Sequence, residues 1–182
     1  MIGIISSIKA RLSSFAREES GSATLDFVIA LPAVVFYFGS AYEGGVLSMR
    51  NVMLQHAVDA TVRQVRIGQI PFATHQNLLE TICEHGSIIP DCEANLRLEM
   101  VRIDPRAWVE PSPEAACVDR EEQGTPVLNF NPGLNNELMV LRVCALFDPM
   151  MPTTGLGKEI PKESGGAYAL VATSSYVMEP FQ

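Results

Sequence analysis

Four cysteines carry the most reactive side chains of this sequence, at positions 83, 92, 117 and 144. An even number of cysteines outside the cytoplasm is typical of a disulfide framework, and four of them allow three pairings. We choose the pairing that ties a short helix to its following loop and a long irregular loop to a strand. The predicted disulfides are Cys83–Cys92 and Cys117–Cys144. The chain-entropy relation assigns these closures about 2.7 and about 3.6 kcal/mol of stabilisation.

A zinc site is the alternative chemistry for the same part of the chain. Cys83, His85 and Cys92, together with Cys117 or His75, form a conceivable ligand set. However, the spacing between His85 and Cys92 does not match the paired spacing of common structural zinc sites, in which about two to four residues separate two cysteines. We therefore expect no metal site.

Catalytic and nucleotide-binding patterns are absent from the sequence. The three histidines, including His56, have no nucleophile motif around them, and neither G-x-S-x-G nor H-E-x-x-H occurs. Residues 69–182 carry a net charge of −9 and residues 1–68 a net charge of +1. An acidic C-terminal part is a poor match to nucleic acid, because phosphate contacts need clustered Lys and Arg. We expect no enzyme activity, no cofactor and no nucleic-acid partner.

An acidic residue, Asp26, stands at the edge of a long apolar run. Residues 27–42 carry no charge, and as a helix they span about 24 Å, slightly less than the roughly 30 Å hydrocarbon core of a bilayer. Continuation of the helix past Glu43 makes up the difference. As a simple uncleaved anchor, the run leaves the acid unexplained. As a secretory signal peptide, it would be cut at the small residues Gly39-Ser40-Ala41.

Basic residues precede the apolar run. Lys9, Arg11 and Arg17 outweigh Glu18 and Glu19, so the positive-inside bias predicts a cytoplasmic N-terminus and a C-terminal part outside the cytoplasm. Residues before the run form either a short helix on the inner leaflet or a disordered leader.

A second helical pattern follows the membrane segment directly. Apolar residues recur at helical spacing over residues 46–67, and Gly68 with Pro71 marks the end. We predict one long helix from about Ala23 to Ile67, loosened at Gly44-Gly45. Its distal half gives an apolar stripe to the chain's own sheet or to a partner helix. The stripe comprises Val46, Met49, Met53, Ala57 and Ala60, with Leu54, Val58 and Val65 beside them.

The remaining residues predict an α+β domain with an antiparallel sheet. Residues 74–85 read as a short helix with Thr74 as its N-cap, Gly86 after its end, and an apolar face. Strands are expected at 94–104, with Arg97 and Glu99 on its polar face, at 137–148 as a central strand, and at 168–178. The segments 105–134 and 148–158 read as loops.

The residues around Asp26 resemble the processing site of type IV pilin precursors. In those precursors a membrane peptidase cuts after a glycine, leaving an acid at the fifth mature position and an aromatic residue at the sixth. Gly21, Asp26 and Phe27 match that pattern. A cut after Gly21 leaves a free amine on Ser22, and in packed helices the acid can pair with the amine of a neighbouring chain.

A longer stretch is similar to the TadE-like proteins, which are minor pseudopilins of the Tad (Flp-type) tight-adherence pilus machinery. The similarity covers residues 15–69 and includes Leu31-Pro32, Glu43-Gly44 and the helix ending V-R-Q-V-R-I-G-Q. Family members usually carry Glu where this chain has Asp26, and Asp keeps the charge on a side chain one methylene shorter.

The resemblance implies a membrane-anchored structural component of an adhesion pilus. Its partners would be a prepilin peptidase, the inner membrane, and the other minor pseudopilins and assembly platform of a Tad pilus. Residues 1–21 would be a cytoplasmic leader, 22–68 the transmembrane and amphipathic helix, and 69–182 a periplasmic domain. The alternative is a periplasmic binding or interaction module tethered by an uncleaved N-terminal membrane helix. The two hypotheses differ in whether the protein is cut after Gly21.

Overall fold

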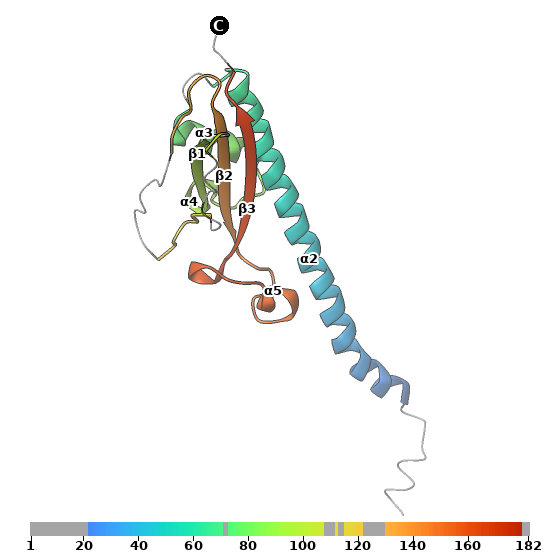
Figure 1. Ribbon diagram of the computed structural model, residues 1–182. Coiled ribbons are helices and arrows are strands. Elements are labelled where there is room, and N and C mark those ends of the chain that lie inside the picture. The colour runs from blue at the N-terminus through green and yellow to red at the C-terminus, as the bar shows by residue number, and fades with distance from the viewer. Residues whose placement is uncertain (1–21, 71–72, 108–111, 113–114, 122–129, 180–182) are drawn as a thin grey trace, which may run out of the picture.

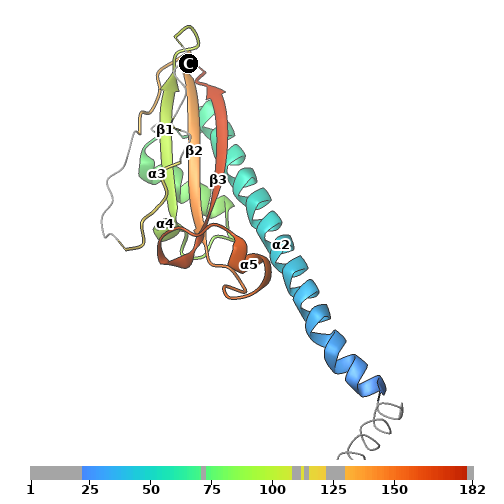
Figure 2. The same ribbon diagram turned by 60° about the horizontal axis from the view of Figure 1, so that its bottom comes forward.

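The protein combines one long helix with a small antiparallel sheet. The computed structural model describes residues 22–70, 73–107, 112, 115–121 and 130–179. It confirms the α+β class, with a long apolar N-terminal helix, a three-stranded antiparallel sheet and two disulfides. The distal half of the helix lies beside the sheet, and its N-terminal half extends away from the domain (Figure 1). A view turned by 60° shows the same arrangement (Figure 2).

The long helix, α2, spans Ser22–Arg66. Its end is closed by Gly68, which adopts the left-handed conformation (φ 74°) that favours glycine. The N–H of Gly68 donates to the carbonyl of Val65 at 3.1 Å. The N–H of Gln69 donates to the carbonyl of Gln64 at 3.0 Å. These two bonds form a Schellman motif, so the predicted stop signal acts through local backbone chemistry.

The helix continues through Gly44-Gly45, so the loosening that we expected there is wrong. A Cβ built on Gly44 would lie 3.6 Å from Cδ2 of Leu156. Leu156, which belongs to a segment expected to be a loop, therefore lies against the helix at this point. The helix also includes Pro32.

The face of α2 that enters the core agrees with the predicted stripe in part. Leu54, Ala57, Val58 and Val65 are buried as predicted, whereas Met49 is half exposed. Thr61 and Val62, which the stripe did not include, are fully or almost fully buried. The core-facing residues of α2 are Leu54, Ala57, Val58, Thr61, Val62 and Val65.

The second long helix, α3, spans His75–His85 and begins at the predicted N-cap. The Oγ1 of Thr74 accepts a hydrogen bond from the N–H of Asn77 at 3.2 Å. The predicted apolar face is buried. Gly86 is the C-cap, but with φ −98° it is not left-handed. A Cβ there would meet the Ile82 carbonyl at 2.9 Å, so lack of space explains this glycine.

The sheet has the order β1-β2-β3, with both pairs antiparallel. β1 spans Leu96–Ile103, β2 spans Leu138–Phe147 and β3 spans Tyr168–Val177. The segment predicted as the central strand, residues 137–148, forms β2, which is the central strand of the sheet. One face of the sheet shares a single core with α2 and α3. Its buried sheet residues are Leu96, Leu98, Met100, Met139, Leu141, Val143, Ala145, Phe147, Tyr168, Ala172 and Tyr176.

The opposite face of the sheet is also covered near β1, contrary to the predicted half-exposed strand. Arg97 is only 7% exposed and the Glu99 side chain only 12%. Cys117 is bonded to Cys144 of the central strand, which holds the irregular segment 115–121 over this face. Because the disulfide brings a distant loop onto the sheet, local alternation alone underestimates the burial of Arg97 and Glu99.

Three short helices complete the fold. α4 spans Cys92–Asn95, η1 spans Ser164–Gly166, and α5 spans Gly155–Glu159. α5 lies in a segment that we expected to be only a loop. It lies beside α2 at the end of the sheet where β2 finishes and β3 begins (Figures 1 and 2). We call residues 148–160 the α5 loop.

Candidate functional site on the membrane-proximal half of α2

The predicted processing residues lie at the start of α2. Ser22 is its first helical residue, whereas Gly21 lies outside the described residues. Asp26 and Phe27 are exposed, and among the described residues no partner reaches the carboxylate of Asp26. A rise of about 6 Å over one turn separates Ser22 from Asp26, so a free amine on Ser22 and this acid would share one helix face.

The first part of α2 is exposed until Gly39. Every residue from Thr24 to Phe38 is exposed, although most are large and apolar. By length and composition this helix can cross a membrane, and it is consistent with single-pass anchoring. A helix that is apolar all round is stable only when buried in protein or lipid. Its exposed apolar residues are Leu25, Phe27, Val28, Ile29, Leu31, Val34, Val35, Phe36, Tyr37, Phe38 and Tyr42.

A buried acid, Glu43, stands where this apolar part ends. It is 1% exposed. Its Oε1 accepts the N–H of Met150 and its Oε2 accepts the N–H of Met151, each at 3.1 Å. The two bonds use both oxygens of the carboxylate and satisfy two backbone donors of the α5 loop. Glu43 therefore fastens the loop to α2. The sequence marked this residue through the family resemblance, but not the partners it binds.

Small residues allow the α5 loop to approach α2 closely. A Cβ built on Gly39 would lie 3.0 Å from Sδ and Cε of Met151. A Cβ on Gly155, whose φ is +59°, would lie 2.7 Å from Oγ of Ser40. Gly39 and Ser40 suggested a signal-peptidase site in the sequence. Here both residues instead have a packing role.

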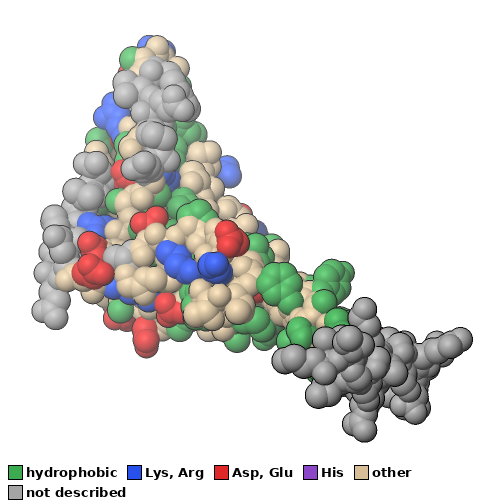
Figure 3. Space-filling view, turned by 90° about the horizontal axis from the view of Figure 1, so that it is seen from below, with side chains coloured by type: hydrophobic (Ala, Val, Ile, Leu, Met, Phe, Trp, Pro, Cys, Tyr) green, Lys and Arg blue, Asp and Glu red, His purple; other side chains and the backbone are tan. Residues whose placement is uncertain are grey.

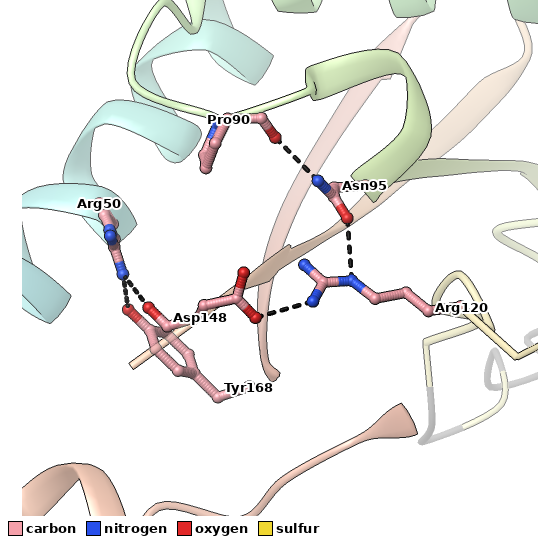
Figure 4. Close-up of polar contacts among 6 residues, drawn as sticks. All are labelled: Arg50, Pro90, Asn95, Arg120, Asp148 and Tyr168. Carbon is pink, nitrogen blue, oxygen red and sulfur yellow. Dashed lines mark hydrogen bonds and ion pairs between the residues drawn. The ribbon is translucent and has the colours of Figure 1, made fainter. Parts of the chain in front are cut away.

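A polar network fixes the point at which the chain leaves β2 (Figure 4). Nη1 of Arg50 donates to the carbonyl of Asp148 at 2.9 Å and to the hydroxyl of Tyr168 at 2.7 Å. Its guanidinium also lies 5.0 Å from the centre of the Phe147 ring. The network thus joins α2 to the end of β2 and the start of β3.

The same network continues away from the helix. The carboxylate of Asp148 accepts from Nη1 of Arg120 at 2.7 Å. Nε of Arg120 donates to Asn95 at 3.0 Å, and Asn95 in turn donates to the carbonyl of Pro90 at 2.8 Å. These groups bind one another, so the arrangement serves to position α2 and the α5 loop relative to the sheet.

The cysteines and histidines are placed apart from α2's exposed half. The structure contains the disulfides Cys83–Cys92 and Cys117–Cys144, which is the pairing that we chose. All four cysteines are paired, so none is left as a thiolate ligand for zinc. The described residues contain no group of three or more His, Cys, Asp and Glu side chains suited to a metal.

The surroundings of His75 perturb its pKa. Burial lowers the pKa of the His75 imidazole, and the positive charge of Arg97 lowers it further. The ring packs edge-on against Phe130, with 5.7 Å between ring centres. This histidine is therefore a packed, neutral residue in the fold.

Comparison with protein-family models, with curated proteins and with solved structures found no match. The functional interpretation therefore depends on the geometry above and on the resemblance in residues 15–69.

Proposed function

We propose that this protein is a minor pseudopilin, a structural assembly component of a Tad (Flp-type) adhesion pilus. In this proposal the N-terminus is in the cytoplasm, α2 crosses the inner membrane, and residues 69–182 form a periplasmic domain. The distal half of α2 packs on the sheet and makes the membrane helix a rigid extension of that domain. The protein has no catalytic role of its own and is a substrate of a prepilin peptidase.

The single observation that supports the proposal most is the exposed, apolar start of α2 with its unpartnered acid. Every residue from 24 to 38 is exposed, and Asp26 finds no partner among the described residues. Such a surface suits helix-to-helix packing between subunits in a membrane or a filament. A carboxylate in that setting is costly unless it is paired.

A cut after Gly21 supplies the missing partner. It creates a positive amine on Ser22, and helices packed side by side can pair this amine with the Asp26 carboxylate of a neighbour. The pair sets the register between subunits, since only one axial offset brings the two charges together. Asp26 also lies near the N-terminus of α2, where the helix dipole favours a negative charge.

Complementation of a pilus-deficient deletion strain tests this role. We expect Asp26→Ala to be inserted in the membrane at the wild-type level but to support no pili. Asp26→Glu retains the charge and carries the residue usual in the family, so it should restore piliation. An Asp59→Ala variant is the control, because this exposed acid lies on the same helix beyond the apolar part. Normal piliation by Asp26→Ala would exclude the pairing role.

The tethered-module alternative predicts a different result for processing. An uncleaved anchor needs neither Gly21 nor a prepilin peptidase. Deletion of the peptidase would then leave the mass of the protein unchanged, whereas the pseudopilin proposal requires the unprocessed precursor to accumulate.

A further inference from the structure

The α5 loop lies beside α2 from Phe36 to Gly44, so part of it is N-terminal to Glu43, where the apolar run ends. Between the loop and α2 is an apolar groove with a volume of about 390 Å³. Its α2 wall includes Leu31, Val35 and Phe36, and its loop wall includes Met151 and Leu156. The α2 residues belong to the middle of the uncharged segment 27–42, so any membrane placement that buries this segment also affects the loop beside it.

The depth of the loop follows from helix geometry. Gly155 lies against Ser40 and Phe36, since a Cβ at this glycine would be 2.7 Å from Oγ of the serine and 3.8 Å from the phenylalanine ring. These two residues precede Glu43 by about 5 Å and about 10 Å along the axis, at 1.5 Å per residue. If the hydrocarbon boundary lies at Glu43, where the uncharged run ends, Gly155 is about 5–10 Å inside it, whereas the side chain of Leu156, which lies against Gly44, is at the boundary. Interfacial elements are typically buried to this depth.

Four backbone polar groups of the α5 loop are bonded by side chains of neighbouring residues. Irregular backbone is tolerated at membrane depth only where its polar groups are satisfied by the protein. Glu43 accepts the N–H groups of Met150 and Met151. Nζ of Lys162 donates to the carbonyls of Pro152 and Lys158, at 3.3 and 3.4 Å. Two N–H groups and two carbonyls of the loop are thus bonded by side chains of residues outside it.

The exposed side chains of the loop include four apolar ones, of Met150, Met151, Pro152 and Leu156, and five polar ones, of Asp148, Thr153, Thr154, Lys158 and Glu159. Of the apolar ones, Met151 and Leu156 line the groove beside α2. Met150 is 52% exposed and Leu156 is 39% exposed. Seen from below, hydrophobic side chains lie on the underside of the domain and on the adjoining helix, with both basic and acidic side chains between them (Figure 3). Lysines beside an apolar surface are suited to headgroup phosphates, because their stems stay in the apolar layer.

We propose that the α5 loop is a second membrane-inserted element. It enters the leaflet on the side of the folded domain, and phospholipid acyl chains of that leaflet fill the groove between the loop and α2. Lipid is the occupant that the geometry favours, since the groove opens on the same surface and at the same depth as the span itself. The loop then fixes the tilt and rotation of the domain on the bilayer. This inference requires the membrane span but not the pilus assignment.

Depth-dependent fluorescence quenching tests the insertion in the full chain. Trp108 is the only tryptophan in the sequence, so Leu156→Trp in a Trp108→Phe background provides one reporter on the loop. The protein is reconstituted in phosphatidylcholine vesicles that contain lipid brominated near the carbonyl end of the acyl chains. Phe38→Trp, on the exposed surface of α2, is the lipid-facing control. Val177→Trp, at the far end of β3, is the aqueous control.

We expect the brominated lipid to quench Leu156→Trp as strongly as Phe38→Trp, with aqueous iodide quenching only Val177→Trp. Quenching of Leu156→Trp by iodide and not by lipid would overturn the proposal, because the loop would stand clear of the bilayer. Protection from both quenchers would also overturn it and would indicate that a second copy covers the groove. Met150→Trp is the parallel reporter if Leu156→Trp fails to fold, as judged by circular dichroism. For Met150→Trp, the expected result and the result that would overturn the proposal are those given for Leu156→Trp.

Discussion

The buried carboxylate of Glu43 provides the sharpest test of how α2 is joined to the domain. Its two oxygens accept one N–H each from Met150 and Met151. Glu43→Gln preserves the size of the side chain but replaces one acceptor oxygen by an NH₂ group. One backbone N–H then faces a donor, and the other keeps a neutral acceptor instead of a charged one.

The expected cost follows from the bonds that are lost. A hydrogen bond to a charged group contributes about 1.5–3 kcal/mol, and a buried donor left unsatisfied costs a comparable amount. Taking one such loss, the free energy for opening the α5 loop falls by about 1.5–3 kcal/mol. Since about 1.4 kcal/mol is a factor of ten, the opening equilibrium rises about ten- to a hundredfold.

Hydrogen exchange measures this opening directly. In the detergent-solubilised full chain, we expect the amides of Met150 and Met151 to exchange about ten- to a hundredfold faster in Glu43→Gln than in the wild type. The amides of β2 should keep their protection and serve as the internal reference. Glu84→Gln is the matched control, because Glu84 is exposed on α3. Unchanged exchange at both methionines would refute the assignment of Glu43 as the clamp.

Three further predictions concern the domain itself. Because the pKa of the His75 imidazole is lowered on folding, the unfolded chain binds the proton more readily. The free energy of unfolding should therefore fall as the pH drops from about 6.5 through the folded-state pKa. A His75→Gln variant should lose this pH dependence, and a urea midpoint that falls with pH as in the wild type would contradict the prediction. Replacing both Cys117 and Cys144 by Ser should cost about 3.6 kcal/mol in urea unfolding by the chain-entropy relation, and a loss near zero would show that the covering loop is not constrained by the bond. Gly155→Ala forces a side chain into the left-handed conformation and should destabilise the protein by about 1–2 kcal/mol or more. Gly45→Ala is the control, because a Cβ at Gly45 meets nothing within 4 Å, and it should stabilise the protein by up to about 1 kcal/mol. Equal thermal shifts for the two variants would exclude a close approach of the α5 loop.

The features that sequence predicted correctly are those set by local chemistry. Hydrophobic periodicity located the long helix and the three strands, and the cap residues Thr74 and Gly68 marked helix boundaries through hydrogen bonds within a few residues. The cysteine pairing followed from the order of the elements that carry them. The helix, strand and cap predictions depend on neighbours along the chain, whereas the Cys117–Cys144 bond joins residues that are 27 positions apart.

The features that sequence missed depend on contacts between distant segments. Glu43 and the residues it binds are separated by more than a hundred positions, so no local pattern could reveal the α5 loop as its partner. The burial of Arg97 depends on a loop that a disulfide holds over the sheet. The predicted stripe of α2 was correct at Leu54, Ala57, Val58 and Val65 but wrong at Met49, which is half exposed, because periodicity does not show which residues of a helix the sheet covers. The role of Asp26 stays a prediction, since its partner would belong to another chain.

The mature N-terminus tests the central claim most directly. The protein should be isolated from its native membrane and its intact mass determined, with N-terminal sequencing of the same sample. The account predicts a chain that begins at Ser22, produced by peptidase cleavage after Gly21. A chain that begins at Met1 would contradict processing and favour a tethered periplasmic module, and one that begins at Tyr42 would show that the apolar run is a cleaved signal peptide.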